Sequence, residues 1–295
     1  MVNLLFKLLL VIYAINLPCY ADVRAMTINT QWLWTPFDKQ VDGSLKHLKD
    51  MSEKKYLDEV SFYAKQIIAR NIDVVALSEI ENEHVANDVV QHLNHESGDT
   101  WQAYFMQGRD TATGQDVAIL SRLPYVADSK TTFNFPSGFI SGAGKAKKLS
   151  KIVGALFLVE TPTGKKTVGV ITAHLLSKRN ETKKKSLNRE KQALGLRKAI
   201  DKFKQGTDAL IIMGDFNDYL SSPTLAHIKG TQLKSYKECD NFKKSLNKNE
   251  IKRWRRNIDH LLYSGLTCKA QYKLDLQGYS DHPAIYGELV IHRSK

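Results

Sequence analysis

The sequence predicts a single layered domain in which β-strands alternate with α-helices. Seven short apolar runs, rich in β-branched or aromatic residues and bounded by polar or glycine positions, are typical of buried strands. Two longer segments carry apolar residues at helical spacing. No internal repeat, low-complexity tract or linker divides the 295-residue chain, which is long enough to bury a substantial core. This combination favours an α/β or α+β architecture.

The apolar runs give the order of the expected elements. Strands are expected at 23–28, 74–77, 117–120, 152–159, 168–172, 209–213 and 258–263. A helix is expected at 52–70, where Tyr56, Val60 and Tyr63 share one face and Ser52 can cap the first turn. The same spacing predicts a second helix at 187–203. The segment 133–150 contains Gly and Pro with few large apolar residues, so we expect a long surface loop there.

The N-terminus has the layout of a secretory signal peptide at 1–21, followed by one domain at 22–295. Lys7 precedes an apolar run, and Cys19 and Ala21 are small residues at positions −3 and −1 of a cleavage site. The run is short for a membrane span, and no later stretch has the length to cross a bilayer. We therefore expect a secreted or periplasmic protein, with an uncleaved anchor as the alternative.

Cleavage would leave two cysteines, Cys239 and Cys268. In an oxidising compartment two cysteines often form a disulfide, although two buried free thiols fit the sequence equally well. Their spacing does not match that of a metal site.

The charge of the chain favours a polyanionic partner. Lys and Arg outnumber Asp and Glu by 43 to 31, a formal net charge of +12, while 42% hydrophobic content excludes disordered and fibrous classes. Basic residues are concentrated at 178–191 and 243–256, with a smaller group of Lys145, Lys147, Lys148 and Lys151. Nucleic acid or an anionic membrane surface would bind such clusters. For any single cluster, a solvated surface is the simpler interpretation.

Polar residues gather where the predicted strands end, which is where active sites are commonly built. Asp215 and Asn217 directly follow the strand at 209–213, and the pattern recurs at Asn29, Glu79, His174, Asp259 and the pair Asp281 and His282. Phosphodiester cleavage needs oxygen ligands for a hard cation such as Mg²⁺, and a general acid and base that histidine can supply. This set of side chains meets those needs.

In this order the motifs resemble the endonuclease/exonuclease/phosphatase superfamily, in particular its deoxyribonuclease-I-like branch. The matching elements are Asn29, 77–79, 117–121, 172–175, 214–217, 258–260 and 280–283. They extend over nearly the whole domain. The resemblance implies a four-layered α/β sandwich, with two mixed β-sheets packed face to face, flanked by helices, and the site at one edge.

The resemblance also implies roles for the site residues. Mg²⁺, with Mn²⁺ or Ca²⁺ as alternatives, would bind at Glu79, supported by Asn29 and Asp281. His282 would pair with Asp259 or Asp281 and act at the scissile phosphate. The remaining roles are water activation by Asp215, phosphate binding by Asn217 and proton donation by His174. Asp116 is a candidate partner for His174, and His260 is either a structural histidine or a third histidine of the site.

The expected substrate is nucleic acid, with DNA favoured over RNA, cut internally by a monomer that needs no stable protein partner. Both large basic clusters adjoin site residues along the chain, which places positive charge where a phosphate backbone would lie. The expected contact residues are Lys151, Lys178, Arg179, Lys183, Lys184, Lys185, Arg253, Trp254 and Arg255. Trp254 either stacks on a base or packs in the core. The alternatives are a secreted sphingomyelinase or phospholipase C-type phosphodiesterase, and a non-catalytic adhesin that binds polyanions.

Overall fold

The computed structural model describes residues 21–36, 52–108, 114–126, 133–134, 149–245 and 248–291. Residues 1–20 of the predicted signal peptide, and Lys145, Lys147 and Lys148 of the smallest basic group, lie outside these ranges.

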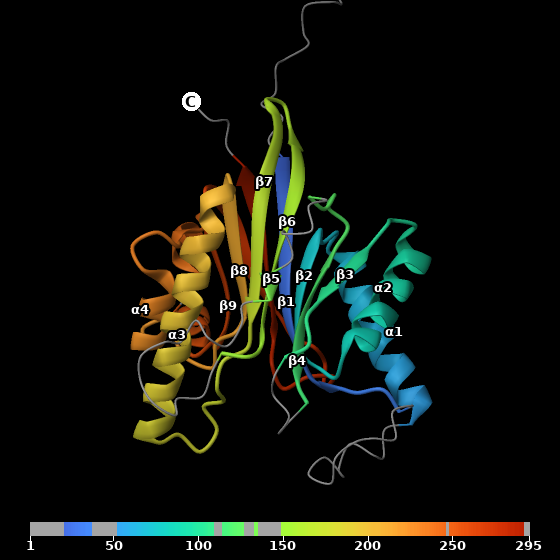
Figure 1. Cartoon of the computed structure of the whole chain (residues 1–295), viewed down its shortest axis with the longest axis horizontal. Coiled ribbons are helices and arrows are strands. Elements are labelled where there is room, and N and C mark those ends of the chain that lie inside the picture. The colour runs from blue at the N-terminus through green and yellow to red at the C-terminus, as the bar shows by residue number, and fades with distance from the viewer. Residues whose placement is uncertain are drawn as a thin grey trace, which may run out of the picture.

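The described residues form two mixed β-sheets that pack face to face (Figure 1). The six-stranded sheet has the order β10-β11-β1-β2-β4-β3. Its strands are β1 (Ala21–Leu33), β2 (Val74–Ile80), β3 (Gln102–Phe105), β4 (Asp116–Ser121), β10 (Leu266–Leu274) and β11 (Ala284–Ile291). The five-stranded sheet has the order β5-β6-β7-β8-β9. Its strands are β5 (Phe133–Asn134), β6 (Ile152–Thr161), β7 (Gly164–Ala173), β8 (Ala209–Asp215) and β9 (Asp259–Ser264).

Helices cover the outer face of each sheet, which completes the predicted four-layered sandwich (Figure 1). The six-stranded sheet is covered by α1 (Glu53–Ala69) and α2 (Glu83–Ser97), and the five-stranded sheet by α3 (Lys183–Phe203) and α4 (Pro223–Lys229). The remaining helices are η3 (Lys204–Gly206), η4 (Tyr236–Glu238), α5 (Asp240–Ser245) and α6 (Lys248–Arg255). Ser52 caps α1 as predicted, because its side chain accepts a hydrogen bond from Lys55 N.

Three apolar clusters fill the spaces between the four layers. The central cluster lies between the two sheets and includes Val23, Ile119, Val170 and Ile211. The second packs α1 and α2 against the outer face of one sheet, and the third packs α3 and α4 against the other. Each sheet therefore has both faces buried, and its strand ends and loops remain to carry chemistry.

A disulfide joins Cys239, which follows η4, to Cys268 in β10, so the paired state is the one the structure supports. Both cysteines are buried in the central cluster. None of the helices in the described ranges has the length and apolar character needed to span a bilayer.

Candidate active site

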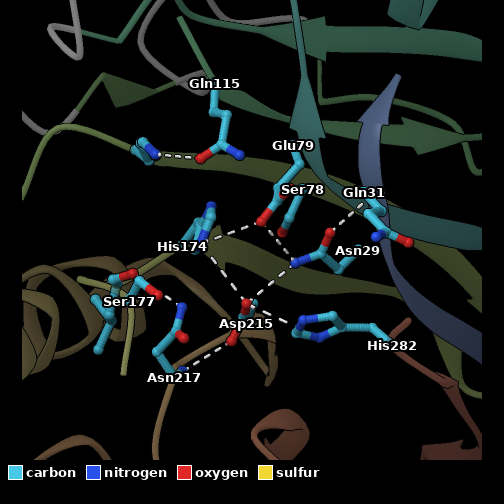
Figure 2. Close-up of polar contacts among 12 residues, drawn as sticks. Asn29, Gln31, Ser78, Glu79, Gln115, His174, Ser177, Asp215, Asn217 and His282 are labelled. Carbon is cyan, nitrogen blue, oxygen red and sulfur yellow. Dashed lines mark hydrogen bonds and ion pairs between the residues drawn. The ribbon is translucent and has the colours of Figure 1, made fainter. Parts of the chain in front are cut away.

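The predicted site residues converge at one edge of the sandwich, where strands from both sheets end (Figure 2). The parallel pair β1 and β2 brings Asn29 opposite Ser78, so Glu79, the next residue of β2, lies at the same edge of the sheet as Asn29. The parallel pair β7 and β8 delivers His174 and Asp215 from the other sheet. Asp259, the first residue of β9, pairs in register with Asp215. Residues that are far apart in the sequence thus meet because both sheets direct these strand ends to the same place.

Asn29 connects the two sheets. Its Nδ2 donates hydrogen bonds of 3.1 Å to Glu79 Oε1 and of 3.1 Å to Asp215 Oδ2. Its Oδ1 accepts from the backbone N of Gln31 at 2.9 Å. In this orientation the amide nitrogen holds two carboxylates and the amide oxygen accepts one backbone hydrogen bond, so the second lone pair of that oxygen stays free for the predicted support of a metal.

The backbone around Glu79 is fixed in an unusual conformation. Glu79 has φ 64, and Gln31 and Trp32 on the neighbouring strand have φ 50 and φ 70. Thr30 Oγ1 lies 3.0 Å from Ser78 O and 3.1 Å from Glu79 O, which ties the two irregular segments together. Left-handed conformations of such residues persist where the surroundings enforce them. Here they aim the Glu79 carboxylate into the site.

Gly214 allows β7 and β8 to approach closely at their ends. Its φ is +140, and a Cβ at this position would overlap the carbonyl oxygen of Ala173. Leu175 N donates to Asp215 O at 2.9 Å beyond this contact. As a result His174 Nε2 lies 3.6 Å from Asp215 Oδ2 and 3.9 Å from Glu79 Oε1.

These side chains fit a divalent cation. Glu79, His174 and Asp215 each offer one ligand atom within 4.8 Å of the others, and Asp215, Asp259 and His282 form a second such group. Burial raises the pKa of Glu79, and burial together with the charge of Asp259 raises the pKa of Asp215 to about 8. Desolvated carboxylates that share one amide donor are costly unless positive charge compensates them. A hard cation would supply that charge through the oxygen ligands it prefers.

His282 and Asp259 form a hydrogen-bonded dyad beside this cluster. His282 Nδ1 lies 2.7 Å from Asp259 Oδ2 and 4.0 Å from Asp215 Oδ2. Burial of the imidazole opposes its charged form, but the hydrogen bond and the charge of Asp259, with the charge of Asp215, raise the pKa of His282 to about 10. The dyad partner is thus Asp259, one of the two predicted alternatives, and it fixes the orientation of the ring.

Asp281 does not join either ligand group, although the resemblance placed it at the metal. Its side chain is 68% exposed, and Oδ1 lies 3.8 Å from His282 Nε2. Ser280 explains this orientation, because its Oγ donates to Asn29 O at 2.8 Å and accepts from His282 N at 3.0 Å. This tight turn directs His282 inward and leaves Asp281 facing outward. Gln31, which the sequence analysis missed, accepts from Asp281 N through Oε1 at 2.7 Å.

Asn217 lies at the site and also organises the loop after β7. Its backbone N donates to Asp215 Oδ1 at 2.8 Å, and its Nδ2 donates to Leu175 O at 3.1 Å. Its Oδ1 accepts from Lys178 N at 3.2 Å. One of the two amide hydrogens is thereby used, which leaves the other for a phosphoryl oxygen.

The two candidates at the margin of the site have structural contacts. Asp116 accepts from Gln107 Nε2 at 2.5 Å and from Gly108 N at 2.8 Å, so it stabilises the loop before β4. His260 Nε2 lies 2.8 Å from Asp218 O, and its ring stacks on Phe216 with centroids 5.9 Å apart. His260 is therefore the structural histidine of the two predicted alternatives.

The predicted substrate contacts of the first basic cluster, together with Lys151 from the smallest basic group, divide into three groups. Lys151 donates to Gln115 Oε1 at 3.0 Å beside the site, and its charge lowers the pKa of Glu79 against the effect of burial. Lys178 is committed to Asp218 Oδ1, at 2.5 Å, and to the ring of Tyr219, so its charge is already compensated. The others lie at or before the start of α3: Arg179, Lys183 and Lys184 are exposed and Lys185 is half-buried.

In the second basic cluster, the sequence allows Trp254 either to stack on a base or to pack in the core, and the structure shows that it packs in the core. Trp254 is 6% exposed and packs against Tyr236, with centroids 4.5 Å apart. Base stacking by this residue is therefore wrong, because the ring is covered by its own domain. Arg253 and Arg255 are exposed on either side. Arg253 faces a pocket of about 330 Å³ beside His282, together with Arg256 and Lys273, which the predicted contact residues did not include.

The same arrangement of layers occurs in solved structures. The human Nocturnin catalytic domain with bound sulfate is 17% identical, covers 91% of this chain and 94% of its own, and has a TM-score of 0.61. A protein from Bacteroides vulgatus described as endonuclease/exonuclease/phosphatase is 16% identical, covers 92% of this chain and 99% of its own, and has a TM-score of 0.59. A mannosyl-6-phosphatase from Bacteroides thetaiotaomicron VPI-5482 is 18% identical, covers 91% of this chain and 100% of its own, and has a TM-score of 0.57. At these identities the likeness shows the fold.

No curated protein matches the chain. The family model described as Endonuclease/Exonuclease/phosphatase family matches residues 27–282, which include every member of the metal-fitting groups and the His282–Asp259 dyad. This chain belongs to the endonuclease/exonuclease/phosphatase family.

Proposed function

We propose that this protein is a secreted, divalent-metal-dependent phosphodiesterase whose substrate is nucleic acid, with DNA favoured over RNA. Members of the family are hydrolases that act on phosphoester bonds and generally depend on a divalent metal. The observation that carries the proposal is the meeting of the half-buried carboxylate of Glu79 and the buried one of Asp215 with two histidines, His174 and His282. This combination supplies the oxygen ligands and the general acid and base that metal-assisted hydrolysis of a phosphodiester uses.

Each residue of the site has its own role in the proposed hydrolysis. The contribution of a divalent cation bound at Glu79 would be polarisation of a phosphoryl oxygen. Asp215, held by Asn29 and by the Asn217 backbone, orients and deprotonates the attacking water. His282, kept charged by Asp259, donates a hydrogen bond to the phosphate, and His174 protonates the leaving oxygen. Asn217 uses its remaining amide hydrogen to hold a phosphate oxygen.

The distribution of charge supports a polyanionic substrate. Exposed basic residues lie at the start of α3, and a basic pocket adjoins His282. Both positions flank the site, where they can contact the backbone of a nucleic acid on either side of the scissile bond. The Cys239–Cys268 disulfide supports export, because such bonds persist in oxidising compartments.

The test is to offer the mature chain plasmid DNA, RNA, sphingomyelin and a soluble phosphomonoester, each with Mg²⁺ and with a chelator. We expect nicking of the plasmid that disappears with the chelator and in Asp215→Ala and His174→Ala. His95→Ala is the matched control, because His95 lies on α2 with its side chain 86% exposed. Release of choline phosphate without nicking would replace the nuclease with a sphingomyelinase, and phosphomonoester hydrolysis alone would indicate a phosphatase.

A further inference from the structure

We propose that the pocket between α6 and His282 is a second phosphate-binding subsite, which holds the phosphate next to the scissile one. The protein would thereby select substrates that carry at least two neighbouring phosphates. This inference rests on the proposed phosphodiesterase function and deepens it by naming the feature of the substrate that is recognised.

The pocket is continuous with the catalytic dyad. It has a volume of about 330 Å³, and Asp259 and His282 form part of its wall. Three basic residues form the part called here the basic wall, namely Arg253, Arg256 and Lys273, and the mostly exposed Asp281 also lines the pocket. Glu79 and His174 are not among the residues that line the pocket. A substrate therefore reaches both the pocket and the metal-fitting group of Glu79 and His174 only if it extends past the His282–Asp259 dyad.

The three positive charges have no carboxylate partner. Within the described ranges, neither Arg253, Arg256 nor Lys273 forms a salt bridge, whereas the buried or half-buried Arg122, Arg189 and Arg197 all do. The Nζ of Lys273 contacts the backbone oxygen of Arg253 at 3.5 Å. Partial burial lowers the pKa of Lys273, and the nearby charge of Arg253 lowers it further while Asp259 raises it. Of the two carboxylates that line the pocket, Asp259 is already paired with His282 and Asp281 is mostly exposed, so the three basic residues leave an excess of positive charge that favours an anion.

The backbone of this basic wall is held in place. Trp254 lies between Arg253 and Arg256 in the chain and is buried against Tyr236 and Phe242. Arg256 N donates to Arg253 O at 3.3 Å, and Asn257 Nδ2 donates to Asp259 O. The turn that presents the two arginines is therefore fixed relative to Asp259. Such pre-organisation reduces the entropy that binding must overcome.

The chemistry of the wall favours phosphate over a cationic headgroup. Arginine can bind phosphate oxygens in a bidentate manner, and lysine adds a further donor. A quaternary ammonium group is recognised by aromatic faces, but no Trp, Tyr or Phe is among the described residues that line this pocket. The pocket thus fits the next phosphate of a polynucleotide and repels the choline of a phospholipid.

The experiment compares a substrate with one phosphate and a substrate with several. Initial rates are measured for bis(4-nitrophenyl) phosphate and for a short single-stranded DNA oligonucleotide, with Mg²⁺, in the mature chain. The variants are Arg256→Gln and Lys273→Gln. The control is Lys165→Gln, which removes an exposed positive charge at the opposite end of β7. Circular dichroism and thermal unfolding verify that all three variants fold.

We expect each pocket variant to lower the ratio of kcat/KM for the oligonucleotide to kcat/KM for the diester by about tenfold, the size of a lost charge-assisted contact. The control keeps the wild-type ratio. A second oligonucleotide carries neutral methylphosphonate linkages on either side of one cleavable bond. For the wild type, kcat/KM for this oligonucleotide should be lower than for the unmodified one by the same factor, and the pocket variants should show little further loss. If the wild type cleaves both substrates and the ratio is the same in variants and control, the subsite is wrong and the proposed function stands. If the wild type cleaves neither substrate, the proposed function fails and the subsite fails with it.

Discussion

His282 Nδ1 lies 2.7 Å from Asp259 Oδ2, and this contact links the turn before β11 in one sheet to the first residue of β9 in the other. Asp259 is buried, and its second oxygen, Oδ1, has no hydrogen-bond partner in the described part of the chain. The aspartate is therefore held chiefly by the histidine. The catalytic orientation of His282 and the satisfaction of a buried charge depend on the same bond.

Replacing Asp259 with Asn should lower kcat by about 10²–10⁴-fold, because the imidazole loses both its orientation and its stabilising charge. In the metal-free protein, NMR titration should give a His282 pKa near 10 in the wild type and a much lower value in Asp259→Asn, where burial dominates. Asp281→Asn is the comparison, because this mostly exposed carboxylate contributes less to the raised pKa of His282 than Asp259 does and its loss should lower that pKa much less. Equal pKa values in wild type and Asp259→Asn would refute the pairing.

The same bond predicts a pH-dependent difference in stability. The folded-state pKa of His282 is raised above its unfolded value, about 6.5. Its contribution is therefore fully present below that value and is lost as pH rises toward about 10. The difference in unfolding free energy between wild type and Asp259→Asn, measured with urea in a chelator, should be largest near pH 6 and should shrink by pH 10. A constant difference would contradict the linkage.

Gly214→Ala should destabilise the protein by about 1–3 kcal/mol and reduce activity, because the added Cβ meets Ala173 O and the backbone has a positive φ. The matched control is Gly206→Ala in η3, where a Cβ meets nothing within 4 Å. Urea unfolding measures the first effect, and kcat under saturating Mg²⁺ measures the second. If both variants behave alike, the close approach of β7 and β8 is not needed for the site.

Mg²⁺ or Mn²⁺ should raise the thermal midpoint of the wild type, since an ion that binds only the folded state adds about 2.7 kcal/mol at one hundred times its Kd. Glu79→Gln and Asp215→Asn should lose most of this shift. Without metal they should be as stable as the wild type or more stable, because each removes a desolvated charge. Glu160→Gln, with an exposed side chain, is the control. A full shift in Glu79→Gln would exclude that residue as a ligand.

Asp218→Asn should destabilise the protein by about 3 kcal/mol, because the fully buried Arg189 would lose one of its two charge partners. Asp218 also accepts from Thr224 Oγ1 at 2.8 Å and from Lys178 Nζ. Asp201→Asn, which removes an exposed carboxylate from its pair with Arg197, should cost well under 1 kcal/mol. Urea denaturation at pH 7 distinguishes the two. Equal losses would mean that the Asp218 network is dispensable.

Much of the site could be predicted because its residues directly follow apolar strands. A local change from an apolar run to polar residues can be recognised in the sequence, and it marks the positions of Asp215, Asn217, Glu79 and His174. Asp281 lies outside both metal-fitting groups because two hydrogen bonds of Ser280, one of them to Asn29 far away in the chain, fix the direction of the turn.

Elements without a clean apolar pattern were missed. The polar positions of β10 hid that strand, and therefore Lys273, from the sequence analysis. The helix α2 and the strand β11 were also not expected, and α3 begins at Lys183 and not at 187 because Thr182 caps it. Burial of Trp254 depends on Tyr236 and Phe242, which fold over it from outside its own helix. These outcomes depend on long-range packing, which local patterns do not contain.

The Cys239–Cys268 bond closes a loop that contains Arg253, Arg256 and Asp259. Closing a loop of this length stabilises a fold by roughly 3–4 kcal/mol in the chain-entropy view. Oxidation thus stabilises the segment that carries the basic wall and the aspartate of the dyad. On the proposed function, a chain retained in a reducing cytoplasm would be poorly organised for cutting nucleic acid, and the same chain would mature after export. The covalent link would then act as a safeguard that spares the genome of the producing cell.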